Sequence, residues 1–302
     1  MVTTIEDLHA DVLARALRRL DGRSLAAASC ATAALRALAA DPETWRALCL
    51  AGWPSLAGLD RRLLDAVPPR RLFADASPLP SADAAGAGEL ELPGMLVSAV
   101  DVYLGGAPLL SRVVETPAAS SPWFLGSPFR VDAVERSRRP APEEAAAPAP
   151  AELELSWVVV DPARGRAVNV SSRRAVAVDR HWYTGETLVR FAVVLGGCKF
   201  EATVACAELG GRVGEVSLAV EDADGAAVAG EGALRLLAAA MEAPRKGGMN
   251  EPEEAKRRYH EFVRRKKGRK ESKARREALV DLCCSAASAV VVLTLIAAVA
   301  LR

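Results

Sequence analysis

The sequence predicts an α+β protein built from a three-helix unit, a β-sandwich-like domain, a basic helix and a single C-terminal transmembrane helix. Three observations predict this order. Apolar residues recur at helical spacing near the N-terminus, alternate with polar residues in the middle, and form one uncharged run of 20 residues near the end. With 302 residues, of which 51% are hydrophobic, the chain is long enough to form such folded units and is not disordered as a whole.

The first unit covers residues 5–73 and is predicted to be helical. Apolar residues follow a helical period from Leu8 onward. A second helix is expected at 24–38, with its first residue, a serine, as the cap. Asp41 is placed to cap a third helix, because a proline and then Glu43 follow it and suit the first helical turn.

Residues 74–93 are rich in Ala, Gly, Ser and Pro and predict a linker. Residues 94–243 predict a β-rich domain that ends in a short helix, because apolar and polar residues alternate along several segments. Within this domain, residues 138–151 are rich in Pro, Ala and Glu and predict a mobile insertion. The predicted strands are 95–104, 109–116, 129–135, 153–160, 166–170, 174–178, 187–195, 200–205 and 215–220.

Charge is unevenly distributed, although the net charge is only +1. Residues 256–276 contain twelve Lys or Arg against two Glu, which leaves the remainder of the chain acidic. Lysine is equally uneven, since none precedes Lys199 and all others lie from Lys246 onward. We therefore expect a basic juxtamembrane helix at 244–281.

The uncharged run covers residues 282–301, and a helix of that length spans about 30 Å, the hydrocarbon thickness of a bilayer. With the basic block before it, the run predicts a tail anchor that contacts membrane lipid and leaves the body in the cytosol. The endoplasmic reticulum is the favoured membrane, and the nuclear envelope or nucleus is the alternative. The run also fits a buried helix of a soluble domain. Cys283 and Cys284 are candidate palmitoylation sites or simply small helix residues.

Several functional classes are disfavoured. The six cysteines contain no Cys-x-x-Cys pair and only three histidines are present, so no metal site and no cofactor are expected. The basic run has few aromatic residues among its cations, so no nucleic-acid partner is expected. His181 lies near Glu186, but a structural role is favoured over general-base catalysis, and the chain is not expected to be an enzyme.

The N-terminal unit resembles an F-box in residues 8–13, 16–20, 24–30, 35–38 and 45–49. Three departures are His9, where the family usually has proline, Thr44 before Trp45, where leucine is common, and Ala31-Thr32-Ala33, where it has bulkier residues. Whether these departures weaken the binding of the F-box to its adaptor protein stays open at this point. The remainder resembles a group of plant F-box proteins with a β-rich C-terminal region, in sequence segments such as 123–131 and 155–162.

The resemblance implies a non-catalytic substrate receptor. The F-box would bind a SKP-family adaptor, and through it a cullin–RING ubiquitin ligase, while the β-rich domain would hold an unknown protein substrate near the ubiquitin-carrying enzyme. The alternative is a membrane-anchored scaffold, or a ligand-binding β-sandwich, whose degenerate F-box recruits no ligase. The residues expected to contact the adaptor are Leu8, Val12, Leu13, Leu17, Leu25 and Trp45.

A candidate substrate surface comes from the densest cluster of polar and aromatic residues in the β-rich region. Arg, Trp and Tyr dominate the energetic centres of protein interfaces. The other interpretation is a loop packed by its own aromatic side chains. The cluster consists of Arg173, Arg174, Arg180, His181, Trp182 and Tyr183.

Overall fold

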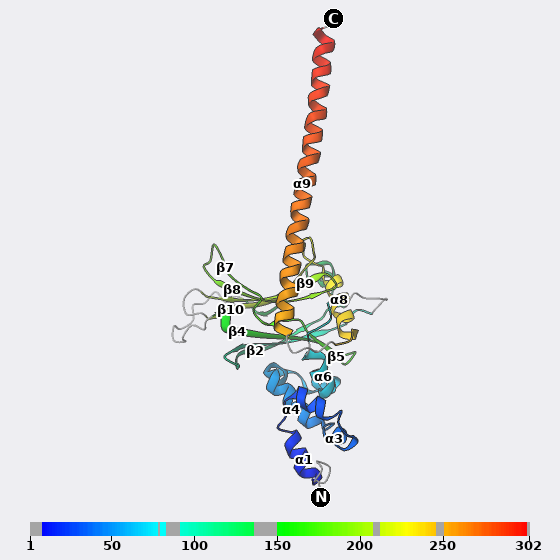
Figure 1. Cartoon of the computed structure of the whole chain (residues 1–302), viewed down its shortest axis with the longest axis vertical. Helices are drawn as coiled ribbons and strands as arrows, with labels where there is room; N and C mark the ends of the chain where they lie inside the picture. Colours follow the sequence, from blue (N-terminus) through cyan, green and yellow to red (C-terminus); the bar gives the residue numbers. More distant parts are fainter. Residues whose placement is uncertain are drawn as a thin grey trace.

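The computed structural model describes residues 8–77, 79–82, 91–135, 150–207, 212–245 and 251–300. These residues form four successive layers (Figure 1): short N-terminal helices, a first antiparallel sheet, a second antiparallel sheet, and a long C-terminal helix that leaves the body on the far side. This is an α+β arrangement in which the C-terminal helix begins near the N-terminal helices, passes along the two sheets and extends beyond them on the opposite side (Figure 1).

The N-terminal helices make up what we call the helical unit, residues 8–77. Its elements are α1 (Ala10–Leu17), α2 (Gly22–Ala28), α3 (Ala33–Leu38), α4 (Pro42–Gly52), the 3-10 helix η2 (Pro54–Gly58), α5 (Arg61–Ala66) and α6 (Pro69–Ala76).

The helical unit contains more helices than the three predicted, because the expected second helix is divided into α2 and α3 and because η2, α5 and α6 follow α4. Asp21 caps α2 in place of Ser24, and its carboxylate accepts the backbone N–H groups of Arg23 and Ser24, both at 3.0 Å. The Thr32 hydroxyl caps α3 by accepting the N–H of Leu35 at 3.2 Å. Each cap satisfies N–H groups that have no partner within the helix. The cap at Thr32 therefore starts α3 as a helix separate from α2.

The β-rich region forms two antiparallel sheets. The first sheet has the order β2-β1-β4-β5, and β6 also pairs with β4. The second sheet has the order β3-β10-β9-β8-β7. The strands are β1 (Leu96–Leu104), β2 (Ala107–Thr116), β3 (Arg130–Val134), β4 (Leu153–Asp161), β5 (Arg166–Asn169), β6 (Arg173–Arg174), β7 (Ala177–Arg180), β8 (Thr187–Leu195), β9 (Cys198–Cys206) and β10 (Val213–Glu221).

The main hydrophobic core contains buried residues from both sheets and from α8 (Gly230–Glu242). Trp157 of the first sheet and Phe191 and Phe200 of the second are its largest fully buried side chains. Two short elements complete the domain, α7 (Pro122–Gly126) and the 3-10 helix η3 (Pro150–Glu152). Most of the apolar area that stabilises this domain is therefore buried between the two sheets.

The two central strands of the first sheet, β1 and β4, are buried on both faces. Val100 and Val102 of β1 belong to the main core, whereas Val97 and Ala99 of the same strand pack against the helical unit. Successive side chains of a strand point to opposite faces, so a strand covered on both sides is apolar along its whole length. The helical unit and the sandwich therefore share a hydrophobic core.

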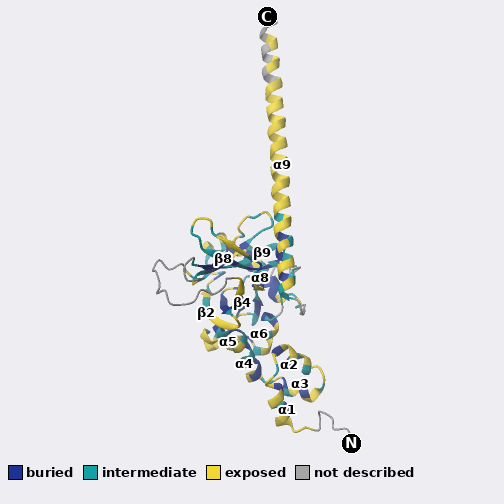
Figure 2. Cartoon of the chain, turned by 60° about the vertical axis from the view of Figure 1, so that its left-hand side comes forward, coloured by how far each residue is buried: buried dark blue, intermediate teal, exposed yellow. Residues whose placement is uncertain are grey.

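The last helix, α9, runs from Glu251 to Ala300. Its first turns lie on the outer face of the second sheet, where Ala255, Tyr259 and Phe262 are buried. Beyond them, Lys266 and Arg269 still form ion pairs with Glu221 and Asp224 of the sandwich. The rest of the helix continues away from the body with its described side chains exposed (Figure 2). A helix of 50 residues is about 75 Å long, so most of α9 lies outside the folded body.

The predicted transmembrane helix at 282–301 is wrong. In the described part of the chain, no helix offers a stretch that is long and apolar enough to cross a membrane. The sequence argument counted the absence of charge, but residues 283–289 are all Cys, Ser or Ala, which contribute little apolar area. The predicted tail-anchored localisation is contradicted by the same finding, and the predicted contact with membrane lipid is left without support.

Some expectations fall outside the described residues. These are most of the predicted mobile insertion at 138–151, a large part of the predicted linker at 74–93, and most of the segment that precedes α9. The first described residues of the predicted linker, 74–76, form the end of α6, whereas Pro80 and Ala82 bond to α9 and to the sandwich. The carbonyl of Ala82 accepts the N–H of Gly196 at 3.0 Å, and that of Pro80 accepts the Arg258 guanidinium at 3.0 Å.

Candidate functional site

The helical unit has its own small core around Trp45, which is 1% exposed. The indole N–H of Trp45 donates to the carbonyl of Ala39 at 2.7 Å, and its ring meets that of Phe73 with centroids 5.5 Å apart. The Arg70 guanidinium lies 5.7 Å from the centroid of the indole ring. Trp45 on α4 thus joins the chain before α4 to α6, and it fixes how the first helices are presented.

The structure divides the six predicted adaptor contacts into two groups. Leu8 and Val12 are 47% and 55% exposed, whereas Leu13, Leu17, Leu25 and Trp45 are buried. Leu25 and Trp45 face the core and are not available to a partner. Val12 and the exposed Ala16 lie one helical turn apart and therefore share a face of α1. We call Leu8, Val12 and Ala16 the α1 face.

Two of the departures from the F-box pattern have local structural roles. His9 is the N-cap of α1, and its Nδ1 accepts the N–H of Asp11 at 3.4 Å. Thr32 caps α3, as described above. These residues begin α1 and α3 through side-chain hydrogen bonds to backbone N–H groups.

The helical unit is fixed to the first sheet by an apolar contact. Trp53, Leu56 and Leu72 are buried against strand residues such as Val97 and Val158. The Trp53 indole N–H donates to the Ser156 hydroxyl of β4 at 2.9 Å. A movement of the helical unit relative to the sheet would expose this apolar surface and break the hydrogen bond.

A buried carboxylate, Asp101 of β1, lies at the same junction. It accepts the Ser55 N–H at 2.8 Å, the Ser55 hydroxyl at 2.5 Å and the Ser111 hydroxyl at 2.6 Å. Burial raises the pKa of the Asp101 carboxyl, and the three hydrogen bonds act in the opposite direction. Because Ser55 belongs to η2 and Ser111 to β2, this one side chain connects the helical unit to two strands.

A second ionic connection links α6 to β5 and α8. The Asp75 carboxylate is buried and lies 2.8 Å from Nε of Arg166 and 3.3 Å from Nε of Arg71. Arg166 also bonds to Glu242 of α8 at 2.8 Å. Sequence reasoning missed both Asp75 and Asp101, although an aspartate between two valines of a mostly apolar strand was a usable signal.

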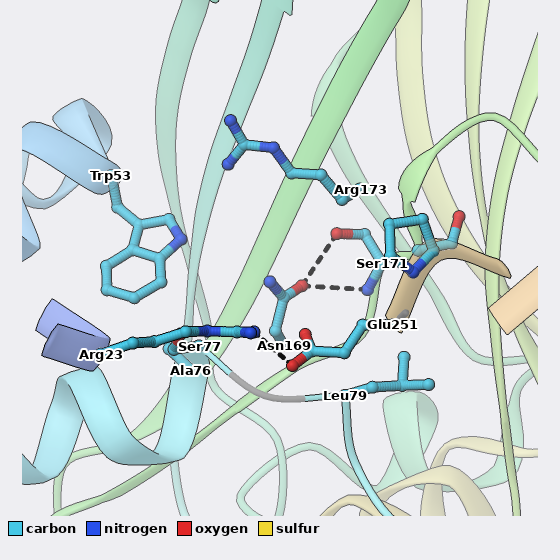
Figure 3. A pocket seen from close by; sticks show the side chains of 11 residues that line it. Arg23, Trp53, Ala76, Ser77, Leu79, Asn169, Ser171, Arg173 and Glu251 are labelled. Atoms are coloured by element: carbon cyan, nitrogen blue, oxygen red, sulfur yellow. Dashed lines mark hydrogen bonds and ion pairs between the residues drawn. The ribbon is translucent and has the colours of Figure 1, made fainter. Parts of the chain in front are cut away.

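The cavity shown in Figure 3 has a volume of about 270 Å³ and lies where α2, the first sheet and the start of α9 meet. Arg23 of α2 forms an ion pair with Glu251 of α9 across it. Asn169 accepts the N–H of Ser171 at 3.0 Å and its hydroxyl at 2.8 Å. These polar groups bind one another, so their observed role is to hold three parts of the chain together.

The structure separates the six residues of the predicted substrate surface, because Arg173 and Arg174 lie on the first sheet and the others at the end of β7 in the second. The Arg173 guanidinium lies over the ring of Tyr103 at 4.6 Å, and its Nε is 2.8 Å from the Glu154 carboxylate. Arg173 has a positive φ of 59°. The Arg173 side chain therefore packs against residues of the first sheet. Arg174 beside it is exposed.

Arg180 to Tyr183 lead from β7 into the turn before β8. Trp182 and Tyr183 are 90% and 79% exposed, and their ring centroids are 5.6 Å apart. His181 accepts the N–H of Thr184 at Nδ1 over 3.1 Å, which stabilises the turn. Two large aromatic side chains are therefore displayed to solvent at one end of the second sheet.

No metal centre is formed by the cysteines, histidines and acids of the described residues. Within the described ranges, no three His, Cys, Asp or Glu residues are grouped closely enough to bind an ion. Burial raises the pKa of the Cys49 thiol to about 12 and that of Cys206 to about 11, so neither is a reactive thiolate at neutral pH. Cys283 and Cys284 are exposed on α9, and their palmitoylation stays a prediction.

Comparison with known proteins places the whole chain among plant F-box proteins. A probable F-box protein of Arabidopsis thaliana is 36% identical over 296 residues, which cover 93% of this chain and 90% of the relative. A second F-box protein of A. thaliana is 34% identical and covers 92% and 91%. The F-box protein GID2 of Oryza sativa subsp. japonica is 39% identical over 59 residues, or 20% of this chain and 28% of its own.

No family model and no solved structure matches the chain. The relatives from A. thaliana nevertheless cover both the helical unit and the sandwich at more than 30% identity. The chain therefore belongs to the plant F-box protein family.

Proposed function

We propose that this chain is a substrate-receptor subunit of a cullin–RING ubiquitin ligase of the SCF type. In this proposal the helical unit binds a SKP-family adaptor, and the sandwich presents a protein substrate for ubiquitination. Members of the F-box family are typically non-catalytic adaptors, so the chain contributes by holding the substrate near the reacting thioester. The exposure of Leu8 and Val12 beside a well-packed helical core is the observation that carries the proposal.

The shared core supports the presenting role. A receptor raises the effective concentration of a substrate lysine only if its two binding surfaces keep a fixed relation. The packing of Trp53 and Leu56 on the first sheet, together with the Asp101 hydrogen bonds, joins the adaptor-binding unit and the sandwich into one body.

For the substrate we propose the turn at 180–183. Its support is the exposure of Trp182 and Tyr183, since aromatic side chains are frequent anchors of protein interfaces. Arg173 does not belong to this surface, because its guanidinium is already stacked on Tyr103 and bound to Glu154.

Substituting the exposed Val12 tests the adaptor contact. Purified full-length chain should bind the adaptor, and Val12→Asp should weaken that binding by about 2 kcal/mol or more, which is about thirtyfold in Kd. A carboxylate at this position would have to lose its hydration within an apolar interface. Isothermal titration calorimetry measures the change, with circular dichroism to show that the fold is unchanged.

Leu109→Asp is the matched control, because Leu109 is 49% exposed on β2, in the sandwich. It should bind the adaptor as the unsubstituted chain does. Equal binding by Val12→Asp and Leu109→Asp would contradict the proposed contact. No binding by the unsubstituted chain would contradict the receptor role altogether. Leu13 and Leu17 are unsuitable for this test, because both are buried and their substitution would disrupt folding.

A further inference from the structure

Lysine is concentrated in one element of this protein. The chain has seven lysines and 32 arginines. The arginines occur in both the helical unit and the sandwich, whereas five of the seven lysines lie in α9. A general preference for arginine accounts for the scarcity of lysine, but it does not account for this placement. The lysines of α9 are Lys256, Lys266, Lys267, Lys270 and Lys273.

Outside α9, Lys199 is the one lysine among the described residues, and its amine is inaccessible. Lys199 is 7% exposed. Its Nζ lies 2.7 Å from the Glu201 carboxylate and 3.9 Å from that of Glu221. The rings of Tyr259 and Phe262 of α9 lie 5.7 Å and 5.9 Å from the same nitrogen. The first turns of α9 therefore cover this amine.

The lysines of α9 are presented to solvent. Lys256, Lys267, Lys270 and Lys273 are exposed, while Lys266 is half-buried and bonds to Glu221 at 2.5 Å. After the buried Tyr259 and Phe262, α9 extends beyond the second sheet, on the side of the sandwich away from the helical unit (Figure 1). The amines of Lys267, Lys270 and Lys273 are thus separated from the α1 face by the sandwich, whereas Lys256 lies near Glu251, the partner of Arg23 in α2.

We propose that α9 is the segment of this chain that accepts ubiquitin when the chain is assembled in a ligase, and that the helical unit and the sandwich are not modified. The inference rests on the proposed function, which brings the ubiquitin thioester of a conjugating enzyme near this chain. The free amine of an α9 lysine attacks the thioester carbonyl. An isopeptide bond forms, the carbon–sulfur bond breaks, the enzyme cysteine leaves as thiolate, and the amine proton passes to solvent.

The placement of the acceptors has a consequence for the ligase. Ubiquitin is a folded protein, and its attachment beside the α1 face would obstruct adaptor binding. Attachment on the part of α9 that follows Phe262 leaves the α1 face uncovered, because this part of the helix extends away from the body on the side opposite the helical unit. The chain can therefore be marked for removal while it is still an assembled receptor.

Reconstitution with the full-length chain tests this inference. The chain is first shown to bind the adaptor, and is then incubated with cullin–RING, activating enzyme, conjugating enzyme, ubiquitin and ATP. The test variant replaces all five α9 lysines by arginine, which keeps the charge. The matched control is Lys199→Arg with Lys246→Arg. We expect conjugates on the unsubstituted chain and on the control, and their loss from the test variant.

Mass spectrometry of the unsubstituted chain gives the same answer without a variant, since the modified peptides should come from α9. Modification mapped to Lys199 or Lys246, conjugates retained by the test variant, or no conjugate on an adaptor-bound chain would each overturn the inference while leaving the receptor role standing. Failure of the unsubstituted chain to bind the adaptor is a separate result, which would overturn the proposed function and this inference together.

Discussion

Trp45→Ala is expected to lower the free energy of unfolding by about 3–5 kcal/mol, the usual cost of removing a large aromatic side chain from a core. The indole is almost fully buried, packs against Phe73, and donates a hydrogen bond to the Ala39 carbonyl. Its loss leaves a cavity and an unpaired carbonyl in a unit with a small core. Denaturant unfolding followed by circular dichroism measures the change.

Trp182→Ala is the matched control, because the same side chain is removed from an exposed turn. Its free energy of unfolding should stay within about 0.5 kcal/mol of the unsubstituted value. Adaptor binding should be lost in Trp45→Ala through misplacement of α1, and kept in Trp182→Ala. Similar stability of the two variants would contradict the role given to the helical core.

Asp101→Ala is expected to cost about 3 kcal/mol or more, because it leaves three buried donors of Ser55 and Ser111 without their acceptor. The effect should be located at the junction, where η2 meets the first sheet. Amide hydrogen exchange should therefore increase in η2 and the adjoining end of α4. Unchanged exchange in these segments would contradict the coupling assigned to Asp101.

The ionisation of Asp101 adds a pH dependence that Asp101→Asn removes. Burial raises the carboxyl pKa above its ordinary value of 3.8, so the folded state binds the proton more tightly than the unfolded state. This contribution to stability is fully present below the unfolded-state pKa and is lost as the pH rises through the folded-state pKa. The unfolding free energy of the unsubstituted chain relative to Asp101→Asn should therefore decrease from acid pH upward, and a constant difference would contradict the raised pKa.

Secondary structure was largely predictable, because it depends on local patterns. The predicted strand at 153–160 is β4, that at 187–195 is β8, and Asp41 with its proline begins α4 as expected. The division between α2 and α3 was not predictable from apolar periodicity alone. It depends on which of several neighbouring polar side chains acts as a cap, and both Asp21 and Ser24 suit that role.

The site was less predictable, because burial depends on tertiary packing. Leu8 and Leu25 both fit a helical apolar pattern, and only the packed unit shows that Leu25 faces the core whereas Leu8 faces solvent. The six residues assigned to one substrate surface are close in sequence, yet β6 and β7 belong to different sheets. The error at the C-terminus had a different origin. An uncharged run of 20 residues after a basic block was taken to indicate a membrane span, although residues 283–289 within it contribute little apolar area.

The central claim is that the α1 face binds the adaptor while the buried residues beneath it only support it. Hydrogen–deuterium exchange of the full-length chain, with and without a saturating SKP-family adaptor, tests this most directly. Amides of residues 8–17 should become protected on binding, whereas those of β7, β8 and α9 should be unchanged. No protection at 8–17 in a chain shown to be adaptor-bound would contradict the claim.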